Sequence, residues 1–123
     1  QIWIVNYTDP LNPDIKMIGA ALFLHDGGLD ASHRYFLVAA NQSNKIAVVD
    51  LKEGSLVGLV DVGKVPHPGR GADWIDPEFG PVWTTPHLGE ASMVSIGTDP
   101  AGHAANAWKA VRTVELPGSG SLF

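Results

Sequence analysis

Short apolar runs separated by turn-forming residues repeat along the whole chain. Two of these runs, residues 35–40 and 46–49, are almost continuously apolar, whereas a strand with one wet face alternates apolar and polar side chains. We therefore expect neighbouring layers to cover both faces of these strands. The pattern predicts an all-β chain, with one helical turn at residues 101–107 and strands over residues 1–7, 34–40, 45–50, 55–62, 80–85, 92–98 and 108–116.

The chain also repeats itself. One unit runs from Gly19 to Gly63 and the next from Gly63 to Gly118. If an innermost strand starts at the histidine segment of each unit, Asp50 and Asp99 close the third strands. A period of roughly 40–50 residues with four strands per unit is typical of a β-propeller blade. The fold class predicted here is therefore a β-propeller fragment of about two and a half four-stranded blades.

The ends of the sequence fit this reading. Gln1 lies inside a predicted strand, and residues 120–123 are typical of the start of another. We therefore expect residues 1–123 to be part of a single, longer propeller domain. Blades that lack their neighbours leave apolar faces uncovered, so we expect this stretch alone to be unstable and inactive.

Composition narrows the possible partners. The chain has 13 acidic and 8 basic residues and a net charge of −5, with no basic run, which argues against a nucleic-acid partner. No apolar run approaches the ~20 residues that a bilayer requires, so membrane insertion is not expected. The chain has no cysteine, which excludes a disulfide framework, a thiol nucleophile and a covalent haem attachment motif within it.

Two histidines occupy equivalent points of the repeat. His25 lies in a His-Asp-Gly-Gly segment, and His67 follows 42 positions later in His-Pro-Gly-Arg-Gly. Equivalent residues of adjacent blades converge on the same end of the propeller axis, so both imidazoles are expected over one ligand. A neighbouring Asp26 is either an orienting partner or an ordinary turn residue. No zinc motif accompanies these residues, and no metal site is predicted.

Other side chains leave two interpretations open. Arg70, in a glycine-flanked loop, suits a carboxylate ligand but equally suits an ion pair with Asp73 or Asp26. Trp83, like Trp74, is either a wall of a cofactor pocket or a packing residue between blades. The remaining histidines are expected to have structural or solvent-exposed roles, namely His33, His87 and His103.

Several segments resemble the haem d1 domain of the cytochrome cd1 nitrite reductase family. They are GAALFLHDGG at residues 19–28, SHRYF at 32–36, VDVGK at 60–64, PHPGRGA at 66–72, GPVW at 80–83 and IGTDP at 96–100. The resemblance covers essentially the whole chain. It implies an eight-bladed propeller that binds haem d1, with a separate cytochrome c domain upstream.

The resemblance also implies a function and roles for individual residues. Members of this family reduce nitrite to nitric oxide in the bacterial periplasm, as homodimers that receive electrons from a small c-type cytochrome or a cupredoxin. By this resemblance, His25 and His67 match the catalytic pair on the distal side of haem d1, and Arg70 matches a basic residue near the haem carboxylates. The proximal iron ligand and the haem c site lie upstream of Gln1.

Two other functions remain open. A related d1-haem propeller acts in maturation of the cofactor, where a pair of histidines that protonates nitrite is not needed. A propeller can also be a non-catalytic binding module, because fold alone does not define function.

Overall fold

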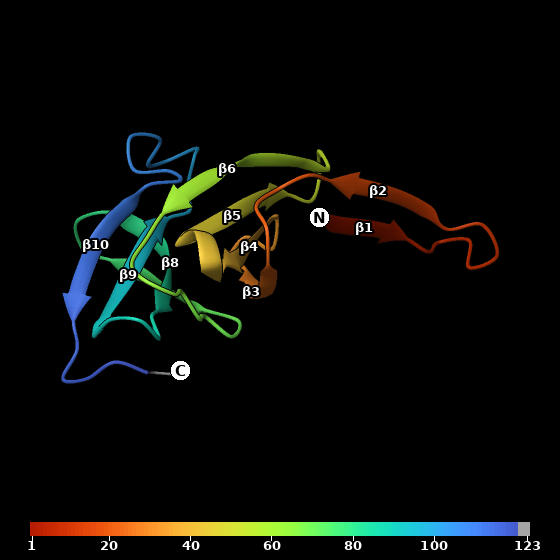
Figure 1. Ribbon diagram of the computed structural model, residues 1–123. Helices are drawn as coiled ribbons and strands as arrows, with labels where there is room; N and C mark the ends of the chain where they lie inside the picture. Colours follow the sequence, from red (N-terminus) through yellow and green to blue (C-terminus); the bar gives the residue numbers. More distant parts are fainter. Residues whose placement is uncertain (121–123) are drawn as a thin grey trace.

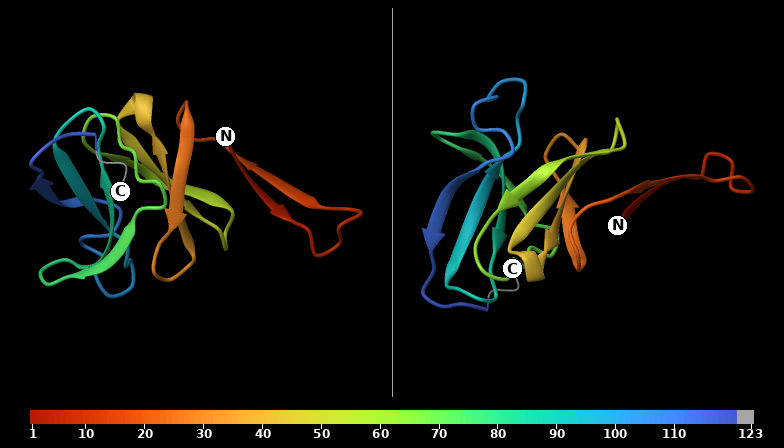
Figure 2. Two further views of the ribbon diagram at one scale, coloured as in Figure 1. Left: turned by 90° about the horizontal axis from the view of Figure 1, so that it is seen from below. Right: turned by 45° about the horizontal axis from the view of Figure 1, so that its top comes forward.

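The computed structural model describes residues 1–120, which form ten strands in three antiparallel sheets (Figure 1). The first sheet is a hairpin of β1 (Ile2–Asn6) and β2 (Asp14–Ile18). Both views of Figure 2 show this hairpin projecting away from the other sheets. Within the described residues, no helix is long and apolar enough to cross a membrane.

The other two sheets have four strands each, and strands that are consecutive in sequence are neighbours in space. The first consists of β3 (Leu24–Leu29), β4 (Tyr35–Ala40), β5 (Lys45–Asp50) and β6 (Ser55–Asp61). The second consists of β7 (Ala72–Asp76), β8 (Gly80–Pro86), β9 (Ser92–Gly97) and β10 (Ala110–Glu115). Each sheet lies inside one of the predicted repeat units, which confirms the four-stranded blades.

The two blades pack face to face. Leu37, Ile46 and Val48 of the first blade and Trp83 and Ile96 of the second are fully buried in one shared cluster. The alternate residues of the first blade are buried as well, since Val38, Ala47 and Val49 are at most 5% exposed. The expectation that both faces of these strands are covered is therefore confirmed.

Three local expectations need correction. Strands β3 and β7 were not among the runs predicted as strands, although His25 does lie at the start of the innermost strand of its blade, as its second residue, while His67 lies five residues before β7. Residues 101–107 form hydrogen-bonded turns rather than a helical segment, and the short helix that is present is η1 (Asn41–Ser43). Gly120 is not in a strand, and the rest of the strand expected to begin there, residues 121–123, lies outside the described part of the chain.

Aspartates close the tight turns at the ends of strands. The Asp50 carboxylate accepts the backbone N–H groups of Lys52 and Glu53 and pairs with Arg34, and this guanidinium lowers the pKa of Asp50. Asp76 does the same in the second blade, where its pKa is lowered chiefly by Arg112. The negative charge of each of these two aspartates is therefore balanced by an arginine of the same blade.

A close backbone contact joins β3 of the first blade to the segment that precedes β7 of the second. Gly28 of β3 is buried, and a Cβ atom placed on it would lie 1.8 Å from the carbonyl oxygen of Arg70. Only glycine allows this approach. The Arg70 segment can therefore lie directly against β3.

We expect the 123-residue chain, expressed alone, to be poorly soluble. Trp3, Tyr7 and Met17 on the projecting hairpin are 58%, 75% and 63% exposed, and apolar surface of this kind with open strand edges favours association. Size-exclusion chromatography and dye binding to exposed apolar surface measure this directly. A monodisperse monomer with a sharp cooperative melt contradicts the prediction.

In the longer protein to which we expect the chain to belong, Gly28→Ala should lower the free energy of unfolding by ~1–3 kcal/mol, because the methyl group overpacks the contact with Arg70. Gly58→Ala is the matched control: this glycine is also in a strand, but no described atom lies within 4 Å of its added Cβ. Denaturant unfolding of both variants compares them, and equal stabilities would show that the Arg70 segment adjusts without cost.

Candidate functional site

The fold brings the two predicted histidines into contact. His25 is the second residue of β3, and His67 lies between β6 and β7. Their Nε2 atoms are 3.2 Å apart, their ring centroids are 4.8 Å apart and the ring planes are inclined by 59°. The His25 side chain is 45% exposed and that of His67 is 20% exposed, so both rings remain open to a ligand.

Backbone pairing with the end of β8 holds His67 in place. The His67 N–H donates to the Pro86 carbonyl at 3.0 Å, and the Leu88 N–H donates to the Val65 carbonyl at 2.8 Å. The two prolines that flank His67 in sequence are both buried. The imidazole is therefore carried by a segment that is anchored to the second blade, although the segment is not itself a named strand.

A local irregularity of β3 holds His25 and its neighbour. The register of β3 on β4 shifts between His25 and Gly27, and Asp26 is the extra residue of this bulge, with φ of 26°. Bulges of this type re-aim side chains and are frequent beside functional sites. Here the bulge directs the Asp26 carboxylate toward the His67 segment, where it accepts the Gly69 N–H at 2.8 Å.

Asp26 faces both imidazoles. One carboxylate oxygen lies 3.6 Å from Nδ1 of His25, and the other lies 3.4 Å from Nδ1 of His67. One ring nitrogen from each of His25 and His67 and one carboxylate oxygen of Asp26 all lie within 4.8 Å of one another. The local sequence showed only His25 and Asp26 together, and the third member comes from the next blade.

Arg70 is exposed. Within the described part of the chain no hydrogen bond and no ion pair within 4 Å joins its side chain to Asp73 or Asp26, although its charge acts on Asp73 from a greater distance and opposes the rise of the pKa of Asp73. Arg70 lines a hollow of about 520 Å³ together with Leu29, His33, Gly71, Ala72 and Asp73. The pKa of Asp73 is raised, mainly by burial and then by the nearby Asp30 carboxylate.

Of the two roles considered for Trp83, a wall of a cofactor pocket or a packing residue between blades, its burial agrees with packing. Its side chain is fully buried in the core between the blades, so it presents no surface to a cofactor. Its indole N–H donates to the carbonyl of Arg70 at 3.1 Å. The cofactor-binding role that the sequence left open for Trp83 is thus replaced by an indirect one, which is to hold the segment that carries Arg70.

The other histidines lie apart from the pair. His87 is fully buried, and its Nδ1 contacts the carbonyl and the hydroxyl of Ser92 at 2.9 and 3.0 Å. His103 is exposed and pairs with Asp99, and His33 is exposed at the rim of the hollow beside Arg70. These positions agree with structural or solvated roles.

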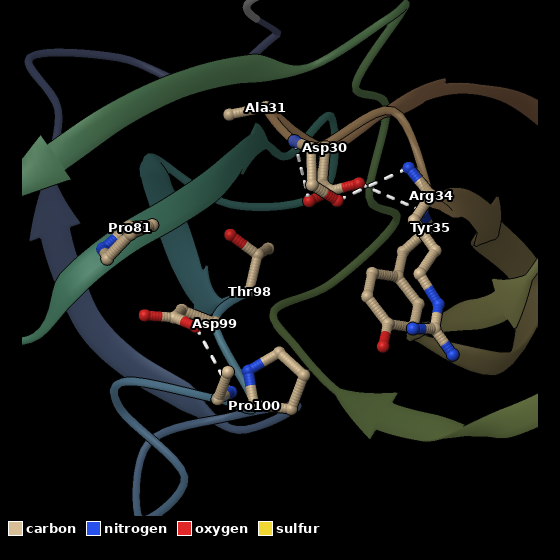
Figure 3. A pocket seen from close by; sticks show the side chains of 10 residues that line it. Asp30, Ala31, Arg34, Tyr35, Pro81, Thr98, Asp99 and Pro100 are labelled. Atoms are coloured by element: carbon tan, nitrogen blue, oxygen red, sulfur yellow. Dashed lines mark hydrogen bonds between the residues drawn. The ribbon is translucent and has the colours of Figure 1, made fainter.

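A second hollow, of about 400 Å³, lies between the blades at the opposite end of β3 (Figure 3). Its ionisable groups are already paired: Asp30 accepts the N–H groups of Ser32 and Tyr35, Arg34 binds Asp50, and Asp99 binds His103. Of the polar groups that line it, the buried Thr98 hydroxyl has no hydrogen-bond partner among the described residues. The ionised groups of this hollow are therefore engaged in local hydrogen bonds and ion pairs that support the fold.

Comparison with solved structures places the chain among known propellers. A dihydro-heme d1 dehydrogenase, NirN, superposes on 93% of the chain with a TM-score of 0.69 at 23% identity. Hydrazine synthase of Kuenenia stuttgartiensis superposes on 80% of it with a TM-score of 0.60 at 17% identity. At these identities the likeness establishes the fold alone, and it confirms the predicted β-propeller fragment.

Sequence comparison is more specific. A nitrite reductase of Stutzerimonas stutzeri is 50% identical over an alignment that includes all of this chain and 23% of that protein. The chain thus spans about a quarter of the length of the relatives that it matches. The family model described as cytochrome D1 heme domain matches residues 1–123. The chain, from its first residue to its last, belongs to the cytochrome D1 heme domain family.

Proposed function

We propose that this chain is part of the haem d1 propeller of a nitrite reductase that forms nitric oxide. The observation that carries the proposal is the contact of His25 and His67 at 3.2 Å on an open surface. The 50% identity to a nitrite reductase supports it, because the alignment with that relative covers the whole of this chain, including the segments that contain His25 and His67.

The surroundings of Arg70 fit a ligand that carries carboxylate groups. Arg70 is exposed, unpaired within the described residues and next to a hollow of about 520 Å³. A guanidinium in that setting binds a carboxylate through two parallel hydrogen bonds. When bound, haem d1 supplies the electron for the reduction, and the chemistry of electron transfer belongs to the cofactor.

The histidines supply charge and protons. Conversion of nitrite to nitric oxide consumes one electron and two protons, and one oxygen atom leaves as water. Imidazole is the side chain that changes charge near neutral pH, and a positioned general acid contributes ~10²–10⁴-fold to a rate. A protonated ring also attracts the anion and stabilises negative charge on the departing oxygen. Two rings in contact place both functions at one point.

Other properties of the complete protein rest on family likeness. We propose a cytochrome c domain that precedes this segment and carries haem c, a homodimeric assembly and a periplasmic location. The electron donor is proposed to be a small soluble c-type cytochrome or a cupredoxin. The net charge of −5 and the absence of basic runs favour such a soluble partner over nucleic acid.

A role in haem d1 maturation is the second candidate. It is favoured by the structural likeness to a dihydro-heme d1 dehydrogenase, at a TM-score of 0.69. The sequence identity of that protein is 23%, compared with 50% for the nitrite reductase. We therefore place nitrite reduction first, and a parallel assay of nitrite turnover and of dihydro-haem d1 oxidation separates the two functions.

In the complete protein, replacement of either His25 or His67 by Ala should lower nitrite turnover by at least ~10²-fold, the low end for a positioned general acid. Because both residues act on one bound anion, the double variant should be far less impaired than the product of the two single effects. Turnover normalised to haem d1 content measures this. His103→Ala, which removes an exposed histidine outside the pair, is the control. Full turnover by either single variant between pH 6 and 8 would show that this histidine has a structural role only.

Arg70→Ala should weaken haem d1 retention roughly 10-fold or more, the loss expected for a hydrogen bond to a charged group. Turnover per remaining haem should change less. Haem d1 occupancy after dialysis gives the first quantity, and normalised turnover gives the second. Lys52→Ala, another exposed cation, should leave both unchanged. If occupancy stays constant while normalised turnover falls, Arg70 acts in catalysis and not in binding.

A further inference from the structure

The backbone of Asp26 has a conformation that is unfavourable for a residue other than glycine. Its φ of 26° is in the left-handed region, which costs a non-glycine residue of order 1 kcal/mol or more. Gly27 follows directly, where a Cβ atom would lie 2.3 Å from the carbonyl of Leu37. The strand therefore places glycine where backbone approach demands it, and it retains a carboxylate at the neighbouring, strained position.

The surroundings of this carboxylate explain its presence. It accepts the Gly69 N–H at 2.8 Å, which ties the bulge of one blade to the His67 segment of the next. Its two oxygens then lie on the Nδ1 sides of the two rings, at 3.6 Å from His25 and 3.4 Å from His67. The side chain is 23% exposed, so water weakens these interactions only in part.

The proton count of the pair follows from this geometry. A carboxylate beside Nδ1 favours a proton on that nitrogen in each ring. The two Nε2 atoms, at 3.2 Å, can interact favourably only if one donates and the other accepts. If both Nδ1 atoms carry a proton, this requires one ring with protons on both nitrogens and one neutral ring, whereas two neutral rings would need one Nε2–H tautomer.

We propose that Asp26 is a positioning residue that sets both imidazoles in the Nδ1–H form, so that His25 and His67 together share a single proton between their Nε2 atoms. The cationic pair and the Asp26 carboxylate then form a unit without net charge. A unit of this kind offers one proton to a ligand and keeps the second ring as an acceptor. Its role in nitrite reduction rests on the function proposed above, whereas the proton arrangement does not.

The test uses the complete protein with ¹⁵N-labelled histidine, purified without haem d1 and with it. Imidazole nitrogen shifts report protonation and tautomer for each ring, assigned by His25→Ala and His67→Ala. At pH 7 the unaltered protein should show one cationic ring and one neutral Nδ1–H ring for this pair. Two neutral rings, or two cationic rings, overturn the proposal.

Asp26→Asn retains the size and the tolerance for positive φ but removes the charge. We expect it to abolish the cationic ring at pH 7 and to introduce the Nε2–H tautomer. Asp26→Gly suits the bulge backbone and should give the same shifts, which guards against misfolding of a single variant. Asp99→Asn, at the separate pair with His103, should leave the His25 and His67 signals unchanged. Unchanged signals in both Asp26 variants overturn the proposal.

Turnover separates this inference from the proposed function. If both hold, Asp26→Asn should reduce nitrite turnover on the order of 10–100-fold, as for other groups that orient a functional imidazole, and should alter its pH profile. If the nitrogen shifts change as expected but turnover does not, the proton arrangement stands and the catalytic role of the histidines fails. If turnover falls while the shifts stay the same, Asp26 acts by another route and the inference is wrong.

Discussion

The packing of one four-stranded sheet on the other determines where every candidate functional group lies. Leu37, Ile46 and Val48 meet Trp83 and Ile96 in a core from which water is excluded. Each large apolar side chain buried in this way contributes about 1.5–3 kcal/mol relative to exposure. The strands carry few polar groups here, so the relative position of the blades is set by shape. The two histidines come from different blades, and they meet because of this packing and not because of an affinity for each other.

A second layer of contacts converts blade packing into a defined site. The indole N–H of Trp83 reaches out of the core to the Arg70 carbonyl, and the same carbonyl rests on Gly28 of the facing blade. One peptide group is thus held from both sides. This places the Arg70 side chain on the exposed rim, and it fixes one end of the loop that contains His67. Asp26 fixes the same loop through Gly69, so the loop is bound to both blades.

The sequence predicted those parts of this arrangement that depend on pattern. Runs that are apolar on both faces identified β4 and β5, and the repeat period located both blades and the convergence of His25 with His67. The inner strands β3 and β7 escaped detection because they are half-exposed and, in β3, interrupted by a glycine pair and a bulge. A strand with these features has neither the alternation nor the apolar run on which such predictions rely.

The individual roles were less accessible to sequence reasoning. The burial of Trp83 depends on which face of β8 meets the other blade. A shift of the strand register by one residue would have placed Trp83 on the opposite face. The exposed guanidinium of Arg70 follows from a loop path that no local rule encodes. Asp26 next to two glycines is a common turn composition, so its contact with a histidine 41 positions away was visible only after the bulge and the blade packing were known.

The ionisable groups at the two ends of the blades differ in type and in their hydrogen-bond partners. At the end marked by the second hollow, Asp50, Asp76 and Asp99 accept backbone N–H groups and pair with Arg34, Arg112 and His103. Their pKa values are lowered, so they contribute stability at pH values above the usual carboxyl range, and this contribution is lost as the pH falls through and below that range. At neutral pH these three Asp carboxylates stay ionised and stabilise their turns. The histidine end instead presents two imidazoles, the side-chain type that ordinarily changes charge near neutral pH. Because the Asp50–Arg34 and Asp76–Arg112 ion pairs do not include the histidine pair, a change of charge on these imidazoles leaves both ion pairs intact.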